Sequence, residues 1–231
     1  MSADGRRRVI LAIDTATSRA LVATGSPYGV VERIAAWTVG YRHSETLLPA
    51  IQRVLAEASL RRADLVGIVV GTGPGAFTGL RVGIATAKGL ALGLGIPLAG
   101  VSTADALLRS AGEGAVLVGP AGPRDRVVSR PGVPAERLTG ADGPVLRPGE
   151  HLVAVDLEGR APADAVALGV AAWDGIAAAL MELGAARLEA MATADPNDRR
   201  GDLETLVPDY VTLPRGVAAT GGEVAWSRDH R

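Results

Sequence analysis

A glycine-rich segment is the first candidate for chemistry in this sequence. Gly71–Ala76 joins an apolar run, Leu65–Val70, to a predicted helix over Thr78–Leu94. Phosphate groups often bind where such a loop leads into a helix N-terminus. A P-loop, however, requires a lysine after its last glycine, and here Gly79 is followed by Leu80. The segment is therefore not a P-loop.

The dinucleotide-binding fingerprint is also absent from this loop. Gly73, Gly75 and Gly79 are spaced one residue too widely for the pattern. The acidic residue that the pattern needs about 20 positions later is missing, because no Asp or Glu lies between Asp64 and Asp105. Two interpretations stay open: a loop that only reverses the chain, or a loop with a further role.

The helix that follows the loop carries a ridge of small residues. Gly79, Gly83, Ala87, Ala91 and Gly95 lie four positions apart. Because glycine inside a helix costs about 0.5–1 kcal/mol relative to alanine, several of them indicate a close backbone approach. The neighbour is either the protein's own sheet or another subunit, and the sequence leaves both open.

Histidine spacing argues against a local metal site. A pair of histidines four positions apart on a helix would share one face and hold a metal. The three histidines, His43, His151 and His230, are far apart, and the sequence contains no Cys. We therefore predict no metal, no cofactor and no catalytic residues.

Asp14 follows the first apolar run, as an aspartate does in kinases of the actin-like fold. Those kinases continue with Gly-Thr, whereas Asp14 is followed by Thr15 and Ala16. We expect Asp14 to cap its own turn rather than to coordinate a metal or phosphate. If the loop touches a nucleotide, Asp14, Thr15, Gly73, Pro74 and Gly75 would lie nearest to it.

Apolar patterning predicts the elements that position these residues. Expected strands are Val9–Ile13, Leu21–Gly25, Val30–Val39, Leu65–Val70 and Ile96–Val101, with helices beginning near Ser44, Thr78 and Ser102. The helix after Ser44 repeats apolar residues at spacings of three and four, including Leu47, Leu48, Ile51 and Leu55. This order predicts an α/β domain with a mixed sheet.

The second half has a weaker pattern. Strands are expected over 116–119 and 152–156, and a helix over Ala163–Leu183. The many Pro and Gly residues over 120–150 indicate either a long irregular connection or an eroded second domain. We predict a first domain over 1–107, a smaller second domain over 108–215 and a disordered tail over 216–231.

Composition excludes several functions. The 24 basic and 25 acidic residues leave a net charge of −1, so no global field attracts nucleic acid or an anionic membrane. The absence of Cys fits a reducing compartment. We expect a cytoplasmic protein with no membrane partner.

Several segments together resemble the TsaB (YeaZ) family, which is glycoprotease-like. The matching segments are Leu11–Thr17, Arg42–Glu45, Leu47–Pro49, Gly73–Gly83, Ala87–Ala91 and Gly100–Ser102. The resemblance covers roughly residues 8 to 110, and the segment at Val207–Tyr210 is similar to a Pro-x-Tyr element of the family.

This resemblance implies an actin-like (ASKHA) fold, with two ribonuclease-H-like domains and mixed sheets, the second small or degenerate. It also implies a non-catalytic subunit in the modification of adenosine 37 of tRNA to threonylcarbamoyladenosine. Such a subunit binds the TsaD transferase, assembles with the ATPase TsaE, dimerises in isolation and meets tRNA only through the complex. The family's association helices correspond to two sets of residues here: Leu47, Leu48, Ile51 and Leu55, and Gly79, Gly83, Ala87 and Ala91.

The sequence departs from the family pattern at two places. Ala76 replaces the usual serine of the glycine loop, and Pro120–Arg124 stands near the place of an expected Asp-Ala-Arg element. Rival functions are a TsaD-like transferase, a glycoprotease-like metalloenzyme and a small-molecule kinase of the actin-like fold.

Overall fold

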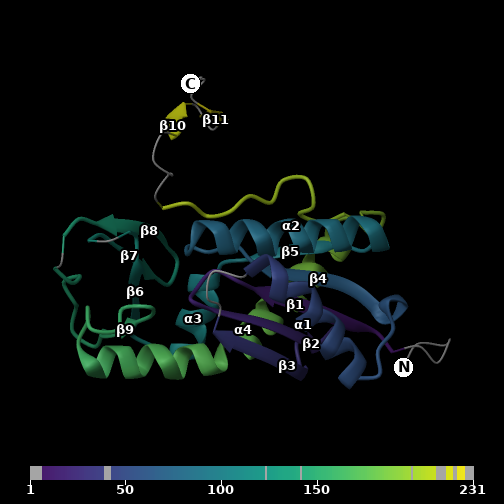
Figure 1. The fold of residues 1–231 in the computed structure, drawn as a ribbon, viewed down its shortest axis with the longest axis horizontal. Coiled ribbons are helices and arrows are strands. Elements are labelled where there is room, and N and C mark those ends of the chain that lie inside the picture. Colours follow the sequence, from purple (N-terminus) through teal and green to yellow (C-terminus); the bar gives the residue numbers. More distant parts are fainter. Residues whose placement is uncertain are drawn as a thin grey trace.

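A computed structural model of the chain describes residues 7–38, 43–122, 124–140, 142–198, 200–211, 217–220 and 223–226. The molecule is elongated and contains two mixed sheets with helices packed against them (Figure 1). A single long helix runs beneath both sheets and connects them.

The first sheet has five strands in the order β3-β2-β1-β4-β5. Its members are β1 (Val9–Asp14), β2 (Arg19–Gly25), β3 (Val31–Thr38), β4 (Leu65–Gly71) and β5 (Leu98–Val101). The first three form an antiparallel meander, and β4 and β5 are added parallel to β1. Ala12 on the central strand faces Ala23 on one side and Val69 on the other. The predicted mixed sheet is confirmed.

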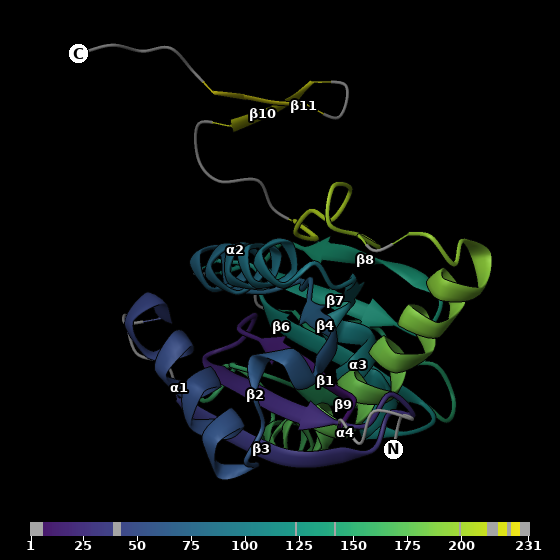
Figure 2. The ribbon, with the colours of Figure 1, turned by 90° about the vertical axis from the view of Figure 1, so that its right-hand side faces the viewer.

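Helices cover both faces of this sheet (Figure 2). Alternate side chains of β1 point to opposite faces, as expected for a strand. Leu11 and Ile13 pack toward α1 (His43–Glu57) and α2 (Phe77–Leu94). Ile10 and Ala12 pack toward the other pair of helices, α3 (Thr103–Ala111) and α4 (Ala163–Ala194).

The second sheet repeats the order of the first without its last strand. It contains β6 (Ala115–Pro120), β7 (Arg126–Arg130), β8 (Val133–Leu138) and β9 (His151–Ala154) in the order β8-β7-β6-β9. Here β6 and β7, and then β7 and β8, pair antiparallel, while β9 pairs parallel with β6. The irregular connection, one of the two alternatives for 120–150, is therefore wrong for β7 and β8. The described residues between β8 and β9 contain no helix, whereas α1 connects β3 to β4.

Helix α4 has 32 residues and contacts strands of both sheets. It continues past the predicted end at Leu183, because Gly184 allows its backbone to approach Val69 closely. A Cβ placed at Gly184 would lie 2.3 Å from a methyl carbon of Val69. Side chains from both sheets and α4 share one apolar cluster. The predicted division at residue 107 falls inside α3 and stays a prediction.

Length and hydropathy alone would let α4 cross a membrane, and among the described residues it is the one helix that meets this test. Its side chains Trp173, Ile176, Leu180 and Met181 are nonetheless buried inside the fold. In this structure α4 is a core helix.

The segment 195–211 returns to the first sheet, although the sequence assigned it to the second domain. Gly201 pairs with Leu98 as an isolated bridge, and Leu206 is buried beneath Gly100. Further on, β10 (Val217–Thr220) and β11 (Glu223–Trp226) pair antiparallel. These eight residues differ from the predicted disordered tail. The other residues of the predicted tail lie outside the described part of the chain.

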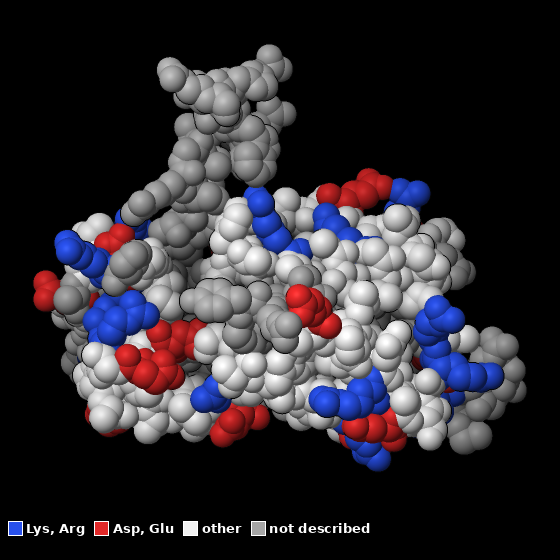
Figure 3. Space-filling model, viewed as in Figure 1, with Lys and Arg blue, Asp and Glu red and all other residues white. Residues whose placement is uncertain are grey.

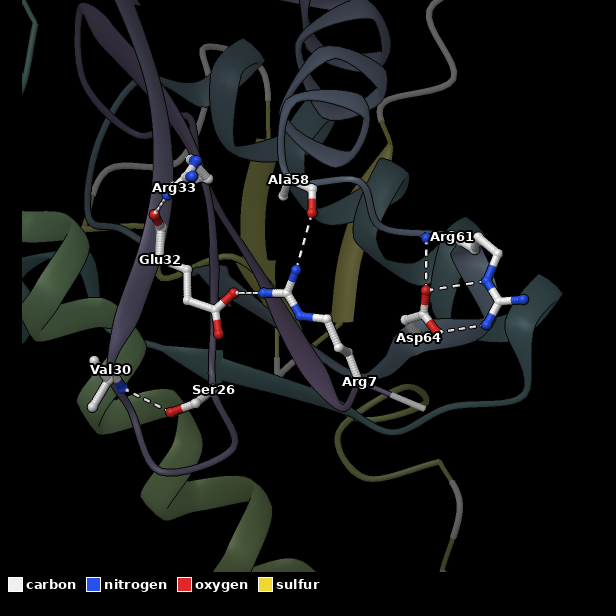
Figure 4. Close-up of polar contacts among 8 residues, drawn as sticks. All are labelled: Arg7, Ser26, Val30, Glu32, Arg33, Ala58, Arg61 and Asp64. Atoms are coloured by element: carbon white, nitrogen blue, oxygen red, sulfur yellow. Dashed lines mark hydrogen bonds and ion pairs between the residues drawn. The ribbon is translucent and has the colours of Figure 1, made fainter. Parts of the chain in front are cut away.

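Polar contacts fasten the edge of the first sheet (Figure 4). Arg7 donates to the carboxylate of Glu32 on β3 and, at 3.0 Å, to the carbonyl of Ala58 after α1. Asp64, which is buried, accepts from the backbone N–H of Arg61 at 2.8 Å and from its guanidinium. These contacts fix the ends of the elements that frame β1.

Candidate functional site

The glycine loop packs against the turn between β1 and β2. The N–H of Ala76 donates to the carbonyl of Ala16 at 2.6 Å. A Cβ at Gly75 would lie 2.0 Å from that carbonyl oxygen, so no larger residue fits there without movement. Gly73 has φ +102°, a conformation that side chains rarely adopt. Glycine is therefore required at both positions for the loop to lie on the turn.

Asp14 lies at the centre of this arrangement and is 1% exposed. Its carboxylate accepts from the Thr103 hydroxyl at 2.6 Å and from the N–H of Ala16 at 2.9 Å. The bond to Ala16, two residues on, confirms that Asp14 caps its own turn. Burial raises the pKa of Asp14 to about 6, and the two hydrogen bonds partly oppose that shift.

Thr103 links Asp14 to the glycine loop. Its hydroxyl accepts from the N–H of Gly73 at 3.1 Å while it donates to Asp14. The N-terminus of α3 is capped by Ser102, which accepts from the N–H of Asp105 at 3.1 Å. The loop, β1 and α3 are thus held by one chain of hydrogen bonds.

Four residues of the predicted small-residue ridge, from Gly79 to Ala91, pack against the chain itself, whereas Gly95 follows the end of α2 and is exposed. Thr15 donates from its hydroxyl to the carbonyl of Gly79 at 2.7 Å. A Cβ at Gly83 would lie 2.2 Å from that hydroxyl oxygen. Ala87 and Ala91 belong to the apolar core beneath. The sequence left open whether this ridge packs against the protein's own sheet or another subunit. In the structure it packs against the protein's own sheet.

Most residues predicted to bind a partner are buried in the chain itself. Leu48 is 50% exposed, but the other seven are in the core or at its edge: Leu47, Ile51, Leu55, Gly79, Gly83, Ala87 and Ala91. Their side chains cannot contact a partner in this conformation. The predicted association surface can therefore be formed only by residues on the outward sides of α1 and α2. That role stays a prediction.

The outward side of α2 carries a second stripe of small residues that the sequence prediction missed. Ala85, Gly89 and Gly93 are exposed and again four positions apart. A Cβ at Gly89 or Gly93 would meet nothing within 4 Å. Leu92 beside them is 70% exposed. The same four-residue spacing, begun at Ala85 instead of Gly79, could have revealed this stripe.

The predicted nucleotide-proximal residues do come together. Asp14 and Thr15 are buried, Gly73 donates its N–H to the Thr103 hydroxyl, and Pro74 and Gly75 face the second sheet. The cavity beside Pro74 and Gly75 measures about 30 Å³, which holds only one or two water molecules. Contact with a nucleotide stays a prediction.

Metal-ligating groups do not gather in the part of the chain that the structure describes. No three side chains of the His, Cys, Asp and Glu types are placed to hold an ion there. His151 lies near Gly114, at the edge of the second sheet. The side chain of His43 and all of His230 lie outside the described residues.

Contacts between the two sheets close the space beside the β1–β2 turn. The Trp173 indole donates to the Thr17 hydroxyl at 3.1 Å, and the Arg19 guanidinium lies 5.0 Å from the indole ring. Asp156 accepts from both the N–H and the hydroxyl of Ser18. The remaining cavity is about 10 Å³.

The C-terminal segment covers the start of α2. Tyr210 packs its ring on Phe77 at 5.2 Å and accepts from Arg81 at 3.1 Å. The N–H of Asp209 donates to the carbonyl of Thr72 at 2.8 Å. The Val207–Tyr210 segment therefore secures the glycine loop from outside.

Two mixed sheets of matching strand order, flanked by helices and joined by α4, define an α/β protein of the actin-like class. The second sheet is the smaller, as predicted. Residues 12–128 match the sequence model of the family described as TsaD, tRNA N6-adenosine threonylcarbamoyltransferase, and the chain belongs to this family.

Individual relatives match about two-fifths of the chain. The tRNA threonylcarbamoyladenosine biosynthesis protein TsaB of Escherichia coli is 41% identical over 94 residues, 41% of this chain and 40% of that protein. An uncharacterized protein of Mycobacterium tuberculosis is 44% identical over 99 residues, 42% of this chain and 47% of that protein. The chain thus spans less than half the length of these curated relatives. The resemblance to TsaB is confirmed.

A solved structure extends the likeness to most of the fold. It is an uncharacterized protein with similarity to peptidase YEAZ from Pseudomonas aeruginosa, with a TM-score of 0.61 and 22% identity. The match covers 89% of this chain and 100% of that one. It supports the fold, including the second sheet.

Proposed function

We propose that this chain is a non-catalytic, TsaB-type subunit in the threonylcarbamoyladenosine modification of tRNA. Its task is to bind and activate a TsaD-type transferase. The observation that carries the proposal is the 41% identity to Escherichia coli TsaB over 94 residues. The exposed side of α1 and α2 is the surface that we assign to the partner.

Energetics support this surface. A glycine at an exposed position inside a helix costs about 1 kcal/mol relative to alanine, and neither Gly89 nor Gly93 is needed for packing within the chain. Exposed Leu48 and Leu92 add apolar area on the two helices, which contact each other. A partner helix that packed closely on Gly89 and Gly93 would explain both features.

Catalysis is assigned to the partner because the sequence lacks a local pair of metal-binding histidines. Its three histidines lie at positions 43, 151 and 230, and it has no Cys. The best rival is a catalytic, TsaD-like transferase, favoured by the family to which residues 12–128 match. The two functions differ in whether the chain alone can transfer a threonylcarbamoyl group.

Further partners follow from the same proposal. A TsaE-type ATPase would join the pair, tRNA would be met through the complex, and the free chain would form a homodimer. These assemblies belong to the cytoplasm.

Co-expression with the TsaD-type protein of the same organism tests the proposal. We expect the two chains to co-purify and Gly89→Arg to abolish the complex, because the added side chain would keep the helices apart. Ala178→Arg, an equally large change at an exposed position of α4, is the matched control and should leave the complex intact.

Failure to co-purify, or a complex that tolerates Gly89→Arg, would contradict the proposed subunit and its surface. Threonylcarbamoyl transfer to tRNA by the purified chain alone would favour the transferase instead.

A further inference from the structure

The outer face of the second sheet opens into a groove of about 840 Å³. This volume lies within the range of small-molecule sites. The other two cavities described above, of about 10 and 30 Å³, are of water size. The groove lies on the side of the sheet that carries Val116, Val118 and Val128.

The groove lies where the second sheet has no counterpart of α1 among the described residues, although the start of α4, at Ala165 and Val166, covers part of this face. In the first sheet, α1 and α2 cover the corresponding face. In the second, the described residues between β8 and β9 form no helix, and Gly140, Asp142 and Gly143 of that connection line the groove instead. Leu152 forms part of its apolar floor.

A buried arginine lines this groove. Arg126 on β7 is 8% exposed and points to the same face as Val128, because the two residues are two apart on one strand. Its guanidinium donates one hydrogen bond, to the carbonyl of Arg160. Among the described residues it forms no ion pair, and its other nitrogens are not among the fully buried atoms that lack a partner. Those nitrogens therefore keep contact with solvent, and Arg126 is one of the residues that line the groove.

A buried charge is costly unless an opposite charge accompanies it. Arg126 has no such companion within the described part of the protein, and Arg124 and Arg160 line the same groove, where the Arg160 guanidinium donates to the carbonyl of Asp156 at 3.0 Å. A backbone carbonyl alone does not offset this charge. The cluster consequently favours an anionic ligand.

The acidic side chains of the groove do not neutralise this cluster. Asp125 is bound to the Arg137 guanidinium and accepts from the N–H of Gly140 at 3.3 Å. Asp142 is the other lining acid. Three arginines thus line the groove beside one carboxylate that is not already paired with Arg137. Figure 3 shows basic and acidic atoms close together over this end of the molecule.

We propose that this groove binds the phosphate group of a phosphorylated ligand. Phosphate carries up to two charges and three free oxygens, so several guanidinium groups can bind it at once. A carboxylate has two oxygens and is filled by one bidentate arginine. This site lies apart from α1 and α2, and it does not depend on the proposed TsaB-type function.

Thermal unfolding of the full chain with inorganic phosphate, adenosine monophosphate or tRNA tests the site. We expect a ligand at about 100 times its Kd to raise Tm by ~5 °C or more. Stabilisation by phosphate or the nucleotide indicates a small ligand. Binding of tRNA alone, by gel shift, indicates the phosphates of a polynucleotide. Acetate is the carboxylate probe, and we expect it to bind at least tenfold more weakly than phosphate.

Arg126→Gln should abolish the ligand-dependent rise while leaving the ligand-free Tm unchanged or higher. If that variant fails to fold, Arg124→Gln combined with Arg160→Gln tests the same groove with exposed residues. Arg62→Gln, an exposed arginine of the first domain, is the matched control and should bind normally. Binding of none of the three phosphate probes, binding unchanged in the groove variants, or equal stabilisation by acetate would each overturn the proposal.

Discussion

At the scale of single residues, Asp14 connects the glycine loop to the core. Its carboxylate joins the turn after β1 to Thr103 at the start of α3, and through Thr103 to Gly73. Because it is fully buried, ionisation is unfavourable, which is why its pKa is raised to about 6 from 3.8. The residue therefore holds the loop in place and makes that arrangement sensitive to pH.

Stability should fall as Asp14 loses its proton. A folded pKa of about 6 against an ordinary value of 3.8 means that the stabilising contribution is complete below 3.8 and is lost as pH rises through about 6. We expect the free energy of unfolding to decrease by about 1 kcal/mol between about pH 5 and about pH 8. Urea denaturation at the two pH values measures this change.

Asp14→Asn is the matched variant, since it keeps the shape and removes the ionisation. Its unfolding free energy should change less between the two pH values than that of the parent chain. Asp209 also has a raised pKa, because of burial and the nearby Asp105. Asp209→Asn should retain most of the pH dependence; an equal slope in the parent and Asp14→Asn would refute the assignment to Asp14.

At the scale of elements, α2 has two stripes of small residues with different causes. The inner stripe allows the helix to lie on the β1–β2 turn, as the short distance between Gly83 and Thr15 shows. The outer stripe, at Gly89 and Gly93, meets open space. Glycine therefore permits close packing in the inner stripe, whereas in the outer stripe it only lowers the stability of the helix.

Alanine substitutions separate the two stripes. Gly83→Ala should lower the free energy of unfolding by about 1–3 kcal/mol, because the new methyl group would overlap the buried Thr15 hydroxyl. Gly89→Ala should raise it by about 0.5–1 kcal/mol through helix propensity. Chemical denaturation of both variants at low protein concentration is the measurement. A stable Gly83→Ala variant would show that α2 does not need this close approach.

Sequence patterns predicted the first sheet and its helices because their apolar residues repeat with regular periods. They failed for β7 and β8, where Arg126, Arg130 and Glu136 interrupt the apolar pattern of a strand. They also ended α4 too early. A glycine such as Gly184 usually marks a helix end in a sequence, and its close contact with Val69 is visible only in the structure.

The candidate site was predictable only in part. Motifs identified the glycine loop and Asp14, whose contacts are local. Which side of α2 is buried depends on the sheet against which the helix packs. Residue type alone therefore could not distinguish the buried Gly83 from the exposed Gly89. The groove around Arg126 depends on the lack of a helix among the described residues between β8 and β9, which a local sequence pattern does not reveal.

At the scale of the whole molecule, the two sheets are held together by polar contacts as well as by α4. Asp156 accepts two hydrogen bonds from Ser18, across the space between β9 and the β1–β2 turn. It does so from a left-handed backbone conformation, with φ +57°. Aspartate and asparagine tolerate this conformation better than alanine does.

Asp156→Ala should destabilise the fold by about 2 kcal/mol, through loss of the hydrogen bonds and backbone strain. Asp156→Asn, which keeps an acceptor and tolerates the conformation, should lose about half as much. Thermal or urea unfolding of the two variants gives the comparison. If both behave like the parent chain, this contact does not help to join the sheets.

The position of α4 in the sequence also bears on how the protein is made. A ribosome releases the five strands of the first sheet well before residues 163–194, yet that helix covers one of the sheet's faces. Until it emerges, Ile10, Leu21 and Val69 have no complete cover, and a nascent chain with such an exposed face is prone to aggregate. Chaperone protection during translation would matter most in the interval between synthesis of β5 and of α4.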